Sequence, residues 1–358
     1  MPSLRLVSAR AVSLLLALAL AACAGVPFAG QPGAPAGGIV YADGDRLLHL
    51  NPDGPMPATP RELLSSRGKG ALADPAWSPD RAQIAYSYTP VPAPGATYGA
   101  DIYVMRADGS GARAVFTHDV DGGLARAPAW SPDGRWLYYS YSFSRKRSGS
   151  ARLETVQQIE RIELASGERQ VVAPGGDLPA VSPDGARLAY LRIPNDLGLT
   201  APAGTPGTSG TPPPAAIPSL WLAAADGSGA RALVNDRRFK MIWAARFSPD
   251  GRSIVFSAAG GEGAQPRLKV SRPKTTGGWP PRVAAHGFPL DLWLVDVETG
   301  KLELLAALAA DDLYPAWSPD GKRLAIQSGD GLFLIDLASG AATTLTASPG
   351  FGALDWAR

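Results

Sequence analysis

The feature that most constrains the fold of this chain is a segment that recurs five times along it. Each copy is centred on Ser-Pro-Asp and continues into an apolar run, and the five align without gaps. The copies are DPAWSPDRAQIAYSY from Asp74, APAWSPDGRWLYYSY from Ala127, LPAVSPDGARLAYLR from Leu178, AARFSPDGRSIVFSA from Ala244 and YPAWSPDGKRLAIQS from Tyr314. Such self-similarity is typical of folds built from stacked or radially repeated units.

Each unit predicts four antiparallel strands. The residues before Ser-Pro-Asp-Gly form a short strand, and Ser-Pro-Asp-Gly forms a turn, because proline presets φ, aspartate accepts local hydrogen bonds and glycine takes positive φ. An alternating second strand follows, as at 137–139. An apolar third strand, as at 101–106, ends in an Asp-Gly or Ser-Gly hairpin turn before a fourth strand such as 112–116. Four strands per repeat predict the blade of a β-propeller.

The two chain ends each carry part of a sixth unit. Residues 38–54 match the second and third pieces of the repeat, and the final FGALDWAR matches only the start of a Ser-Pro-Asp-Gly piece. We therefore predict an all-β, six-bladed propeller over residues 38–358. Pairing of the strand near Trp356 with those near Ile39 and Leu47 should close the ring, since closure removes open strand edges.

The composition supports this fold class and excludes several kinds of site. Gly (41) and Pro (34) make up about a fifth of the 358 residues, a load that helical bundles do not tolerate. A net charge of +2 argues against a nucleic-acid binder that works by bulk charge. One cysteine excludes an internal disulfide and a cysteine-based zinc site, and three histidines leave little material for a histidine-rich metal centre. We expect no metal and no cofactor.

The N-terminus has the features of a targeting signal. Arg5 and Arg10 precede an apolar run over 11–22, which is too short to span a bilayer. The run ends in Leu-Ala-Ala before Cys23, the sole cysteine, and so resembles a bacterial lipoprotein signal. The resemblance implies a signal peptide over 1–22, a lipid on Cys23, and an extracytoplasmic chain anchored to a membrane in the cell envelope. Residues 23–37 then form a Pro/Gly-rich tether. The alternative is an ordinary secretory signal with a chance cysteine.

The repeats also resemble those of TolB-type propellers, within the WD-like group, over nearly all of 38–358. The resemblance implies a non-catalytic interaction platform in the bacterial envelope. TolB proteins carry a further α/β domain before the propeller, which we do not expect here because the tether runs straight into a blade, so a Tol–Pal role does not carry over. Similar propellers accompany prolyl oligopeptidases, but the sequence has no Gly-x-Ser-x-Gly nucleophile turn.

Loop lengths distinguish the two faces of the predicted disc. All long insertions fall between second and third strands, which places them on the face where each innermost strand begins. They cover 89–100, 142–155, 192–217 and 259–289, whereas the matching loops at 328–330 and 43–45 are short. Function tends to lie on variable loops over a rigid scaffold. The alternative is drift in tolerated loops.

Two of these insertions are basic. The clusters are Arg145, Lys146, Arg147 and Arg152 against Glu154, and Arg267, Lys269, Arg272, Lys274 and Arg282 against Glu262. They predict an anionic partner at that face: a phospholipid head group, an acidic envelope glycan or an acidic protein. Solvated loop charges without a partner are the alternative.

A second candidate site is the mouth of the central channel. The residues just before each innermost strand should surround it: Asp74, Arg126, Asp177, Trp243, Asp312 and Tyr314. A polar ring with aromatics could hold a ligand or a peptide end, although every propeller has such a ring. The aspartates of the Ser-Pro-Asp turns and the repeated tryptophans are better explained by turn stabilisation and packing between blades. His118-Asp119-Val120-Asp121-Gly122 has too few ligands for a calcium loop.

We therefore expect a monomeric, lipid-anchored propeller that binds an envelope protein or an anionic envelope component, and no nucleic acid. The alternative is a propeller enzyme, a lyase or hydrolase acting on envelope or extracellular sugars at the channel mouth. Carboxylates converging there with a His or Tyr would favour the enzyme, whereas an open basic crown of loops would favour binding.

Overall fold

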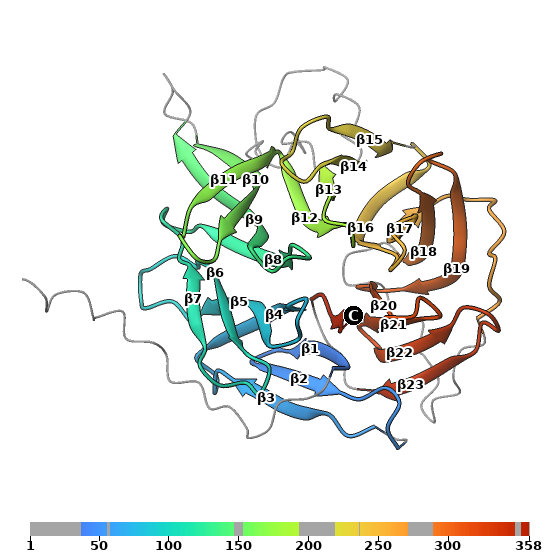
Figure 1. The fold of residues 1–358 in the computed structure, drawn as a ribbon, viewed down its shortest axis with the longest axis horizontal. Coiled ribbons are helices and arrows are strands. Elements are labelled where there is room, and N and C mark those ends of the chain that lie inside the picture. Colours follow the sequence, from blue (N-terminus) through green and yellow to red (C-terminus); the bar gives the residue numbers. More distant parts are fainter. Residues whose placement is uncertain are drawn as a thin grey trace, which may run out of the picture.

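The strands of this protein form a ring of six blades. The computed structural model describes residues 37–55, 58–146, 153–192, 219–235, 237–270, 289–347 and 352–357, and Cys23 lies outside them. The described residues make six four-stranded antiparallel sheets, arranged radially around a common centre (Figure 1). The predicted all-β, six-bladed propeller is confirmed.

The blades follow one another along the chain, with the innermost strand first. Blade 1 contains β4 (Gly70–Trp77), β5 (Gln83–Pro90), β6 (Asp101–Arg106) and β7 (Arg113–Phe116). Blade 2 contains β8 (Leu124–Trp130), β9 (Trp136–Lys146), β10 (Leu153–Glu163) and β11 (Arg169–Pro174). Blade 3 contains β12 (Gly176–Val181), β13 (Arg187–Arg192), β14 (Ser219–Ala224) and β15 (Arg231–Val234). Blade 4 contains β16 (Phe239–Phe247), β17 (Ser253–Gly260), β18 (Leu290–Asp296) and β19 (Leu302–Ala310). Blade 5 contains β20 (Tyr314–Trp317), β21 (Arg323–Ser328), β22 (Gly331–Asp336) and β23 (Ala342–Thr346).

Blade 6 joins the two chain ends and closes the ring. Its innermost strand is β24 (Asp355–Trp356), and its outer strands are β1 (Ile39–Asp43), β2 (Arg46–Leu50) and β3 (Arg61–Ser65). Trp356 lies opposite Ile39 in the β1–β24 pair, and the backbone N–H of Ala357 donates to the carbonyl of Gly38 at 3.0 Å. The predicted closure between the chain ends is confirmed.

The core is divided into six clusters of buried apolar residues, each lying mainly between neighbouring blades. The repeated tryptophans bridge these junctions. The indole N–H groups of Trp77, Trp130 and Trp317 donate across to the carbonyls of Gly38, Ala76 and Arg246, at 3.1, 3.1 and 3.3 Å. In each case the acceptor belongs to the preceding blade. These side chains therefore join blades, as the sequence predicts, with a hydrogen bond in addition to packing.

The Ser-Pro-Asp-Gly turns are held by their own side chains. In blade 2 the Ser131 hydroxyl donates to Asp133 Oδ1 at 2.5 Å, and the same oxygen accepts the backbone N–H of Arg135 at 3.0 Å. The four other turns repeat both contacts, through aspartates 80, 184, 250 and 320. These carboxylates stabilise turns, as expected.

The disc has two faces, which we name by their loops. The turn face carries the Ser-Pro-Asp-Gly turns, and the insertion face carries the loops between the second and third strands of each blade. The chain reaches β1 from the turn face. A Cβ built on Gly37 would lie 3.9 Å from the Arg81 guanidinium in the first turn and 3.6 Å from Ala357.

The 142–155 insertion differs from the predicted loop. Strand β9 continues to Lys146 and β10 begins at Leu153, whereas β8 pairs with β9 only as far as Ser142, and β11 pairs with β10 only from Gln158. The ends of β9 and β10 therefore form a two-stranded ribbon that projects beyond the blade (Figure 1). Alternation in Tyr-Ser-Phe-Ser continues the β9 pattern and could have indicated this extension.

In the part of the chain that the structure describes, no helix is long and apolar enough to cross a bilayer.

Ring closure predicts that Trp356→Ala strongly destabilises the propeller. The side chain is 4% exposed, packs between blades 5 and 6, and lies 5.0 Å from the guanidinium of Arg323. We expect a loss of about 3–5 kcal/mol in the free energy of unfolding, measured with denaturant. Tyr98→Ala is the control, because Tyr98 is 65% exposed. Equal losses for the two variants would contradict the closure argument.

The turn aspartates predict an acid-sensitive component of stability. The hydroxyl of Ser131 and the N–H of Arg135 hold the pKa of Asp133 below its ordinary value of 3.8. Because the folded-state pKa is depressed, the stabilisation is present above that ordinary value and is lost as pH falls through the folded value. Asp133→Ala should therefore cost about 1 kcal/mol in unfolding free energy at neutral pH. As the pH is lowered to about 2, the difference in unfolding free energy between the unaltered protein and Asp133→Ala should become smaller. A difference that does not change with pH would contradict the role given to the Asp133 carboxylate.

Candidate binding site at the channel mouth

The innermost strands carry an irregularity at one position of the repeat. In blades 1 to 4 the pairing between first and second strands shifts register there. The residues at the shift have positive φ although none is glycine: Asp74, Ala127, Leu178 and Ala244, with φ of 51°, 52°, 51° and 49°. Positive φ is uncommon for such residues, and bulges often adjoin functional sites. Four aligned bulges therefore direct attention to this level of the channel.

The predicted ring residues lie at these bulges and not just before the strands. Asp74, Arg126, Asp177 and Trp243 are within β4, β8, β12 and β16, because each strand begins several residues earlier than the sequence suggests. Asp312 does precede β20, and Tyr314 is its first residue. The positions were wrong by part of a strand, yet the structure brings the set together around the channel.

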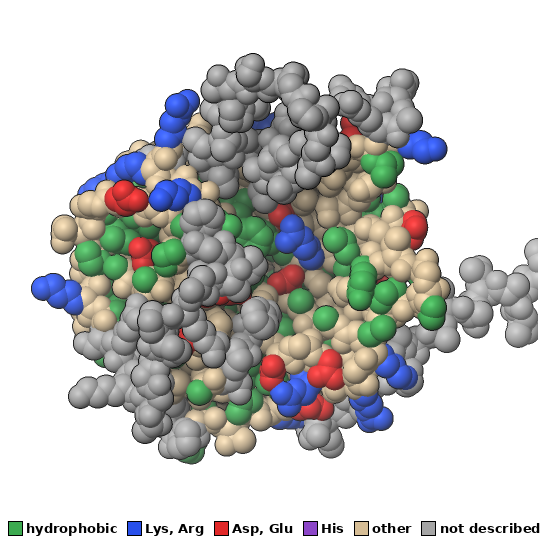
Figure 2. Space-filling view, turned by 180° about the vertical axis from the view of Figure 1, so that it is seen from behind, with side chains coloured by type: hydrophobic (Ala, Val, Ile, Leu, Met, Phe, Trp, Pro, Cys, Tyr) green, Lys and Arg blue, Asp and Glu red, His purple; other side chains and the backbone are tan. Residues whose placement is uncertain are grey.

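A cavity of about 400 Å³ opens at this level on the insertion face. Four of the six predicted residues line it: Asp74, Arg126, Trp243 and Tyr314. The rest of the lining is mainly small and apolar, with Gly44 of the β1–β2 turn at one side. Seen from behind the view of Figure 1, the centre of the disc shows basic and acidic side chains beside hydrophobic ones around a hollow (Figure 2).

The Asp74 carboxylate holds three blades together. Its Oδ1 accepts the backbone N–H of Ala353 at 3.0 Å, and its Oδ2 accepts that of Ala127 at 3.2 Å. These residues belong to the segment leading into β24 of blade 6 and to β8 of blade 2, so an aspartate of blade 1 links both neighbours. Both carboxylate oxygens are thus engaged by backbone donors.

A buried ion pair joins the neighbouring blades 2 and 3. Arg126 Nη2 donates to Asp177 Oδ2 at 2.5 Å, and Oδ1 of Asp177 accepts the N–H of Leu178 at 2.8 Å. The Asp177 side chain is 1% exposed, whereas that of Arg126 is 34% exposed. The pair therefore holds the guanidinium in place while leaving part of its surface toward the cavity.

Two aromatic side chains form the opposite wall. Burial raises the pKa of the Tyr314 phenol to about 12; a hydrogen bond from Trp243 opposes the rise, and the charges of Asp74 and Asp312 add to it. Tyr314 therefore stays protonated at neutral pH. It can donate a hydrogen bond there, but it does not supply a phenolate base.

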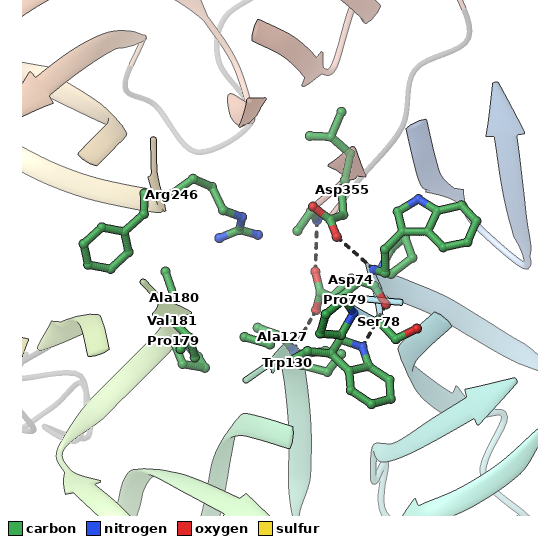
Figure 3. A pocket seen from close by; sticks show the side chains of 18 of the residues that line it. Asp74, Ser78, Pro79, Ala127, Trp130, Pro179, Ala180, Val181, Arg246 and Asp355 are labelled. Atoms are coloured by element: carbon green, nitrogen blue, oxygen red, sulfur yellow. Dashed lines mark hydrogen bonds between the residues drawn. The ribbon is translucent and has the colours of Figure 1, made fainter. Parts of the chain in front are cut away.

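Arg246 is a channel residue that the sequence analysis missed. It lines the 400 Å³ cavity and a neighbouring one of about 300 Å³, nearer the turn face. Its guanidinium points into the channel on the side facing Asp355 (Figure 3). The signal was present in the repeat, because Arg246 replaces the alanine found at this position in the four other copies.

The structure describes only parts of the two basic insertions, and the described parts do not form one cluster. Arg145 and Lys146 are at the tip of the β9–β10 ribbon, where Arg145 pairs with Glu154 at 2.7 Å. The segment with Arg267 and Lys269 instead runs along β19 at the outer rim: Arg267 N–H donates to the carbonyl of Leu304 at 2.9 Å. Arg147, Arg152, Arg272, Lys274 and Arg282 lie outside the described residues.

The carboxylates of 118–122 serve to join blades. Asp119 accepts hydrogen bonds from Tyr141 at 2.7 Å and from Arg169 at 2.9 Å, and Arg169 also binds the buried Glu160 at 2.8 Å. The Arg169 hydrogen bond and the Tyr141 hydroxyl hold the pKa of Asp119 below its ordinary value. His118 Nδ1 is 2.6 Å from Asp101 Oδ1. Among the described residues, no three His, Cys, Asp or Glu side chains come together as metal ligands.

Comparison with known proteins agrees with this architecture. Residues 282–357 match the family model for the dipeptidyl peptidase IV (DPP IV) N-terminal region. The Tol-Pal system protein TolB of Anaeromyxobacter dehalogenans (strain 2CP-C) is 34% identical over 139 residues, which are 36% of this chain and 25% of that protein. The match therefore spans about a quarter of the relative's length.

Solved structures extend the likeness to most of the disc. The crystal structure of TolB from Acinetobacter baumannii superposes with a TM-score of 0.56 at 18% identity, covering 91% of this chain and 68% of that one. A TolB-named structure from Agrobacterium tumefaciens gives 0.51 at 20% identity, covering 82% and 87%. The chain thus contains a TolB-like β-propeller.

The Arg126–Asp177 pair predicts non-additive mutational effects. Arg126→Ala leaves the Asp177 charge buried and unpaired, and should cost about 3 kcal/mol of unfolding free energy. This figure is at the lower end of the range for a broken buried ion pair, because Arg126 is partly exposed. Adding Asp177→Asn removes that charge and should recover part of the loss. Denaturant unfolding of both single variants and the double variant measures the coupling. A double variant no more stable than Arg126→Ala alone would refute the pair's role.

Proposed function

We propose that this protein is a lipid-anchored, extracytoplasmic interaction platform of the bacterial envelope that binds a partner on its insertion face without catalysis. The observation that carries the proposal is the asymmetry of the disc. The insertion face bears the ribbon and the 400 Å³ cavity with its charged lining, whereas the turn face carries five copies of one self-satisfied turn beside the 300 Å³ cavity.

The fold likeness to TolB supports a place in the envelope, and the lipoprotein-like N-terminus supports an anchor through Cys23. A propeller alone does not exclude an enzyme. Carboxylates do converge near Tyr314, as the enzyme alternative requires. The chemistry of the channel still favours binding, because the carboxylates of Asp74 and Asp177 hold backbone N–H groups and Tyr314 remains a neutral phenol. Groups engaged in this way position strands and ligands but are poorly placed to exchange protons.

The partner we propose is an envelope protein, or another anionic envelope component, that contacts the ribbon tip. Lys146 is exposed there, beside the Arg145–Glu154 pair. Exposed charges of this kind steer association more than they hold a complex, so binding strength must come from the channel mouth and the adjoining loops. The arrangement suits a partner that covers both the ribbon and the cavity.

Site-specific photocrosslinking in the native envelope tests the proposal. A photoreactive amino acid at Lys146 should give a discrete crosslinked product, whereas one at Lys322, an exposed lysine in a turn of the opposite face, should give none. Cys23→Ala should release the chain from the membrane fraction and abolish the Lys146 product. Products from Lys322 alone, or a Cys23→Ala chain that stays in the membrane fraction, would contradict the platform or its anchor, respectively.

A further inference from the structure

We infer that the open edge of β9 in the ribbon binds an acidic, extended segment of a partner protein as an added β-strand. The inference rests on the proposed function and deepens it, since it names the backbone groups and the charges by which the insertion face would hold its partner. The edge belongs to residues 143–146, between the last residue of β9 that pairs with β8 and the end of the strand.

A backbone hydrogen bond beside β8 establishes which way the peptide groups of β9 point. The N–H of Ala125 donates to the carbonyl of Ala100 at 2.9 Å, on the side of β8 away from β9. Peptide groups alternate in direction along a strand, so those of the neighbouring Leu124 point toward β9. Its partner in the pair, Ser142, therefore directs its own N–H and C=O back at β8.

The same alternation extends along the ribbon, because β9 and β10 pair without a register shift. Ser144, two residues beyond Ser142, directs its N–H and C=O to the same side, where β8 has already ended. Thr155, opposite Ser144, directs its groups to the outer side of β10. Two residues along β10, the carbonyl of Gln157 accepts the N–H of Gly175 at 2.7 Å on that outer side, as the alternation requires.

The β9 edge is open and leads toward the cavity. In the part of the chain that the structure describes, no strand pairs with β9 beyond Ser142 on the β8 side, and Ser144 and Lys146 are exposed. Unpaired N–H and C=O groups along an edge are a template for another strand. Because β8 is the innermost strand and its Arg126 lines the 400 Å³ cavity, a strand added on the line of β8 approaches the cavity. The open edge of β10 faces the outer rim instead.

The charges at the end of the ribbon favour an acidic strand. Residues 143–156 include four basic residues and one acidic residue, Glu154, and the described structure pairs Glu154 with Arg145 at 2.7 Å. Opposite charges across a strand pair are stabilising, and like charges directly opposite are destabilising. A second copy of this chain would bring the same basic segment to the edge, so the partner is a different protein.

The balance of charge reverses at the base of the ribbon. There Arg169 pairs with two carboxylates, those of Asp119 and Glu160, and Asp121 belongs to the same loop as Asp119. The acidic residues of the added strand therefore belong opposite the end of β9 and not beside β8. A strand antiparallel to β9, as β8 is, begins at that end, so its acidic residues come first.

One apolar position follows from the faces of the ribbon. Phe143 and Val156 lie opposite each other and are both half-buried. A residue added opposite Phe143 shares their face and packs there. The segment we infer is therefore acidic at its first two positions, opposite Lys146 and Arg145, and apolar at its fourth.

Fluorescence anisotropy with the full lipidated chain in detergent tests the inference. The probe is the labelled peptide Asp-Glu-Thr-Val with a C-terminal amide, whose threonine lies opposite Ser144. A methyl group on the threonine nitrogen removes the N–H that donates to the Ser144 carbonyl and should weaken binding about fivefold or more. A methyl group on the valine nitrogen, which points away from β9, is the matched control and should leave affinity unchanged.

A pair of proline variants makes the same comparison in the protein. Ser144→Pro and Thr155→Pro each remove an N–H from one rung of the ribbon, on opposite edges and outside the β9–β10 hydrogen bonds. Ser144→Pro should abolish peptide binding, whereas Thr155→Pro should not change it. Lys146→Glu should weaken the acidic peptide, whereas Lys322→Glu on the turn face should have no effect.

The inference is overturned if the unmethylated peptide does not bind, if the two methylated peptides bind equally, or if the two proline variants lose equally. Should Ser144→Pro fail to fold, the methylated peptides still decide the question with the unaltered protein. A Lys146 crosslink that persists in Ser144→Pro, with no binding of the peptide, would overturn this inference and leave the platform intact. Expected peptide binding without any Lys146 crosslink in the envelope would support the strand-accepting edge and contradict the platform.

Discussion

Every blade of this propeller depends on its neighbours, so the closure of the ring at β1 and β24 is the constraint on which the remaining structure rests. A four-stranded sheet has two apolar faces, and both are covered here only because another blade packs on each side. The join is short: Trp356 and Asp355 pair with Ile39 and Val40. Closure brings together residues more than 300 positions apart in the sequence. The entropy lost when the chain closes on itself is offset by contacts along the whole ring.

The repeat made the architecture predictable because its information is local. Proline, aspartate and glycine at fixed spacing specify a turn whatever surrounds them, and the alternating runs on either side specify strands. The divided sixth blade followed from the fragments at 38–54 and at the C-terminus. What could not be predicted was the start of each innermost strand, since Ala71 and Leu72 carry no turn signal and the bulge recurs at residues of different types, as at Asp74 and Ala127.

The candidate site, like the fold, has features that the sequence predicts and others that it does not. The residue types around the channel were identifiable from their place in the repeat, and the structure gathers them. Their partners were not identifiable, because the bond from Arg126 to Asp177 crosses from blade 2 to blade 3 and depends on the packing between the two. The rim position of Arg267 also escaped prediction: a loop's length does not reveal that it folds back along β19. Arg246 could have been found, as an arginine in an alanine column of the alignment.

The position of Gly37 separates the entry of the chain from the candidate site. Because this residue lies against Arg81 and Ala357, the chain enters β1 on the side of the Ser-Pro-Asp-Gly turns. The ribbon and the 400 Å³ cavity lie on the opposite side. The strand that closes the ring is therefore entered from one face of the disc, and the candidate site is presented on the other.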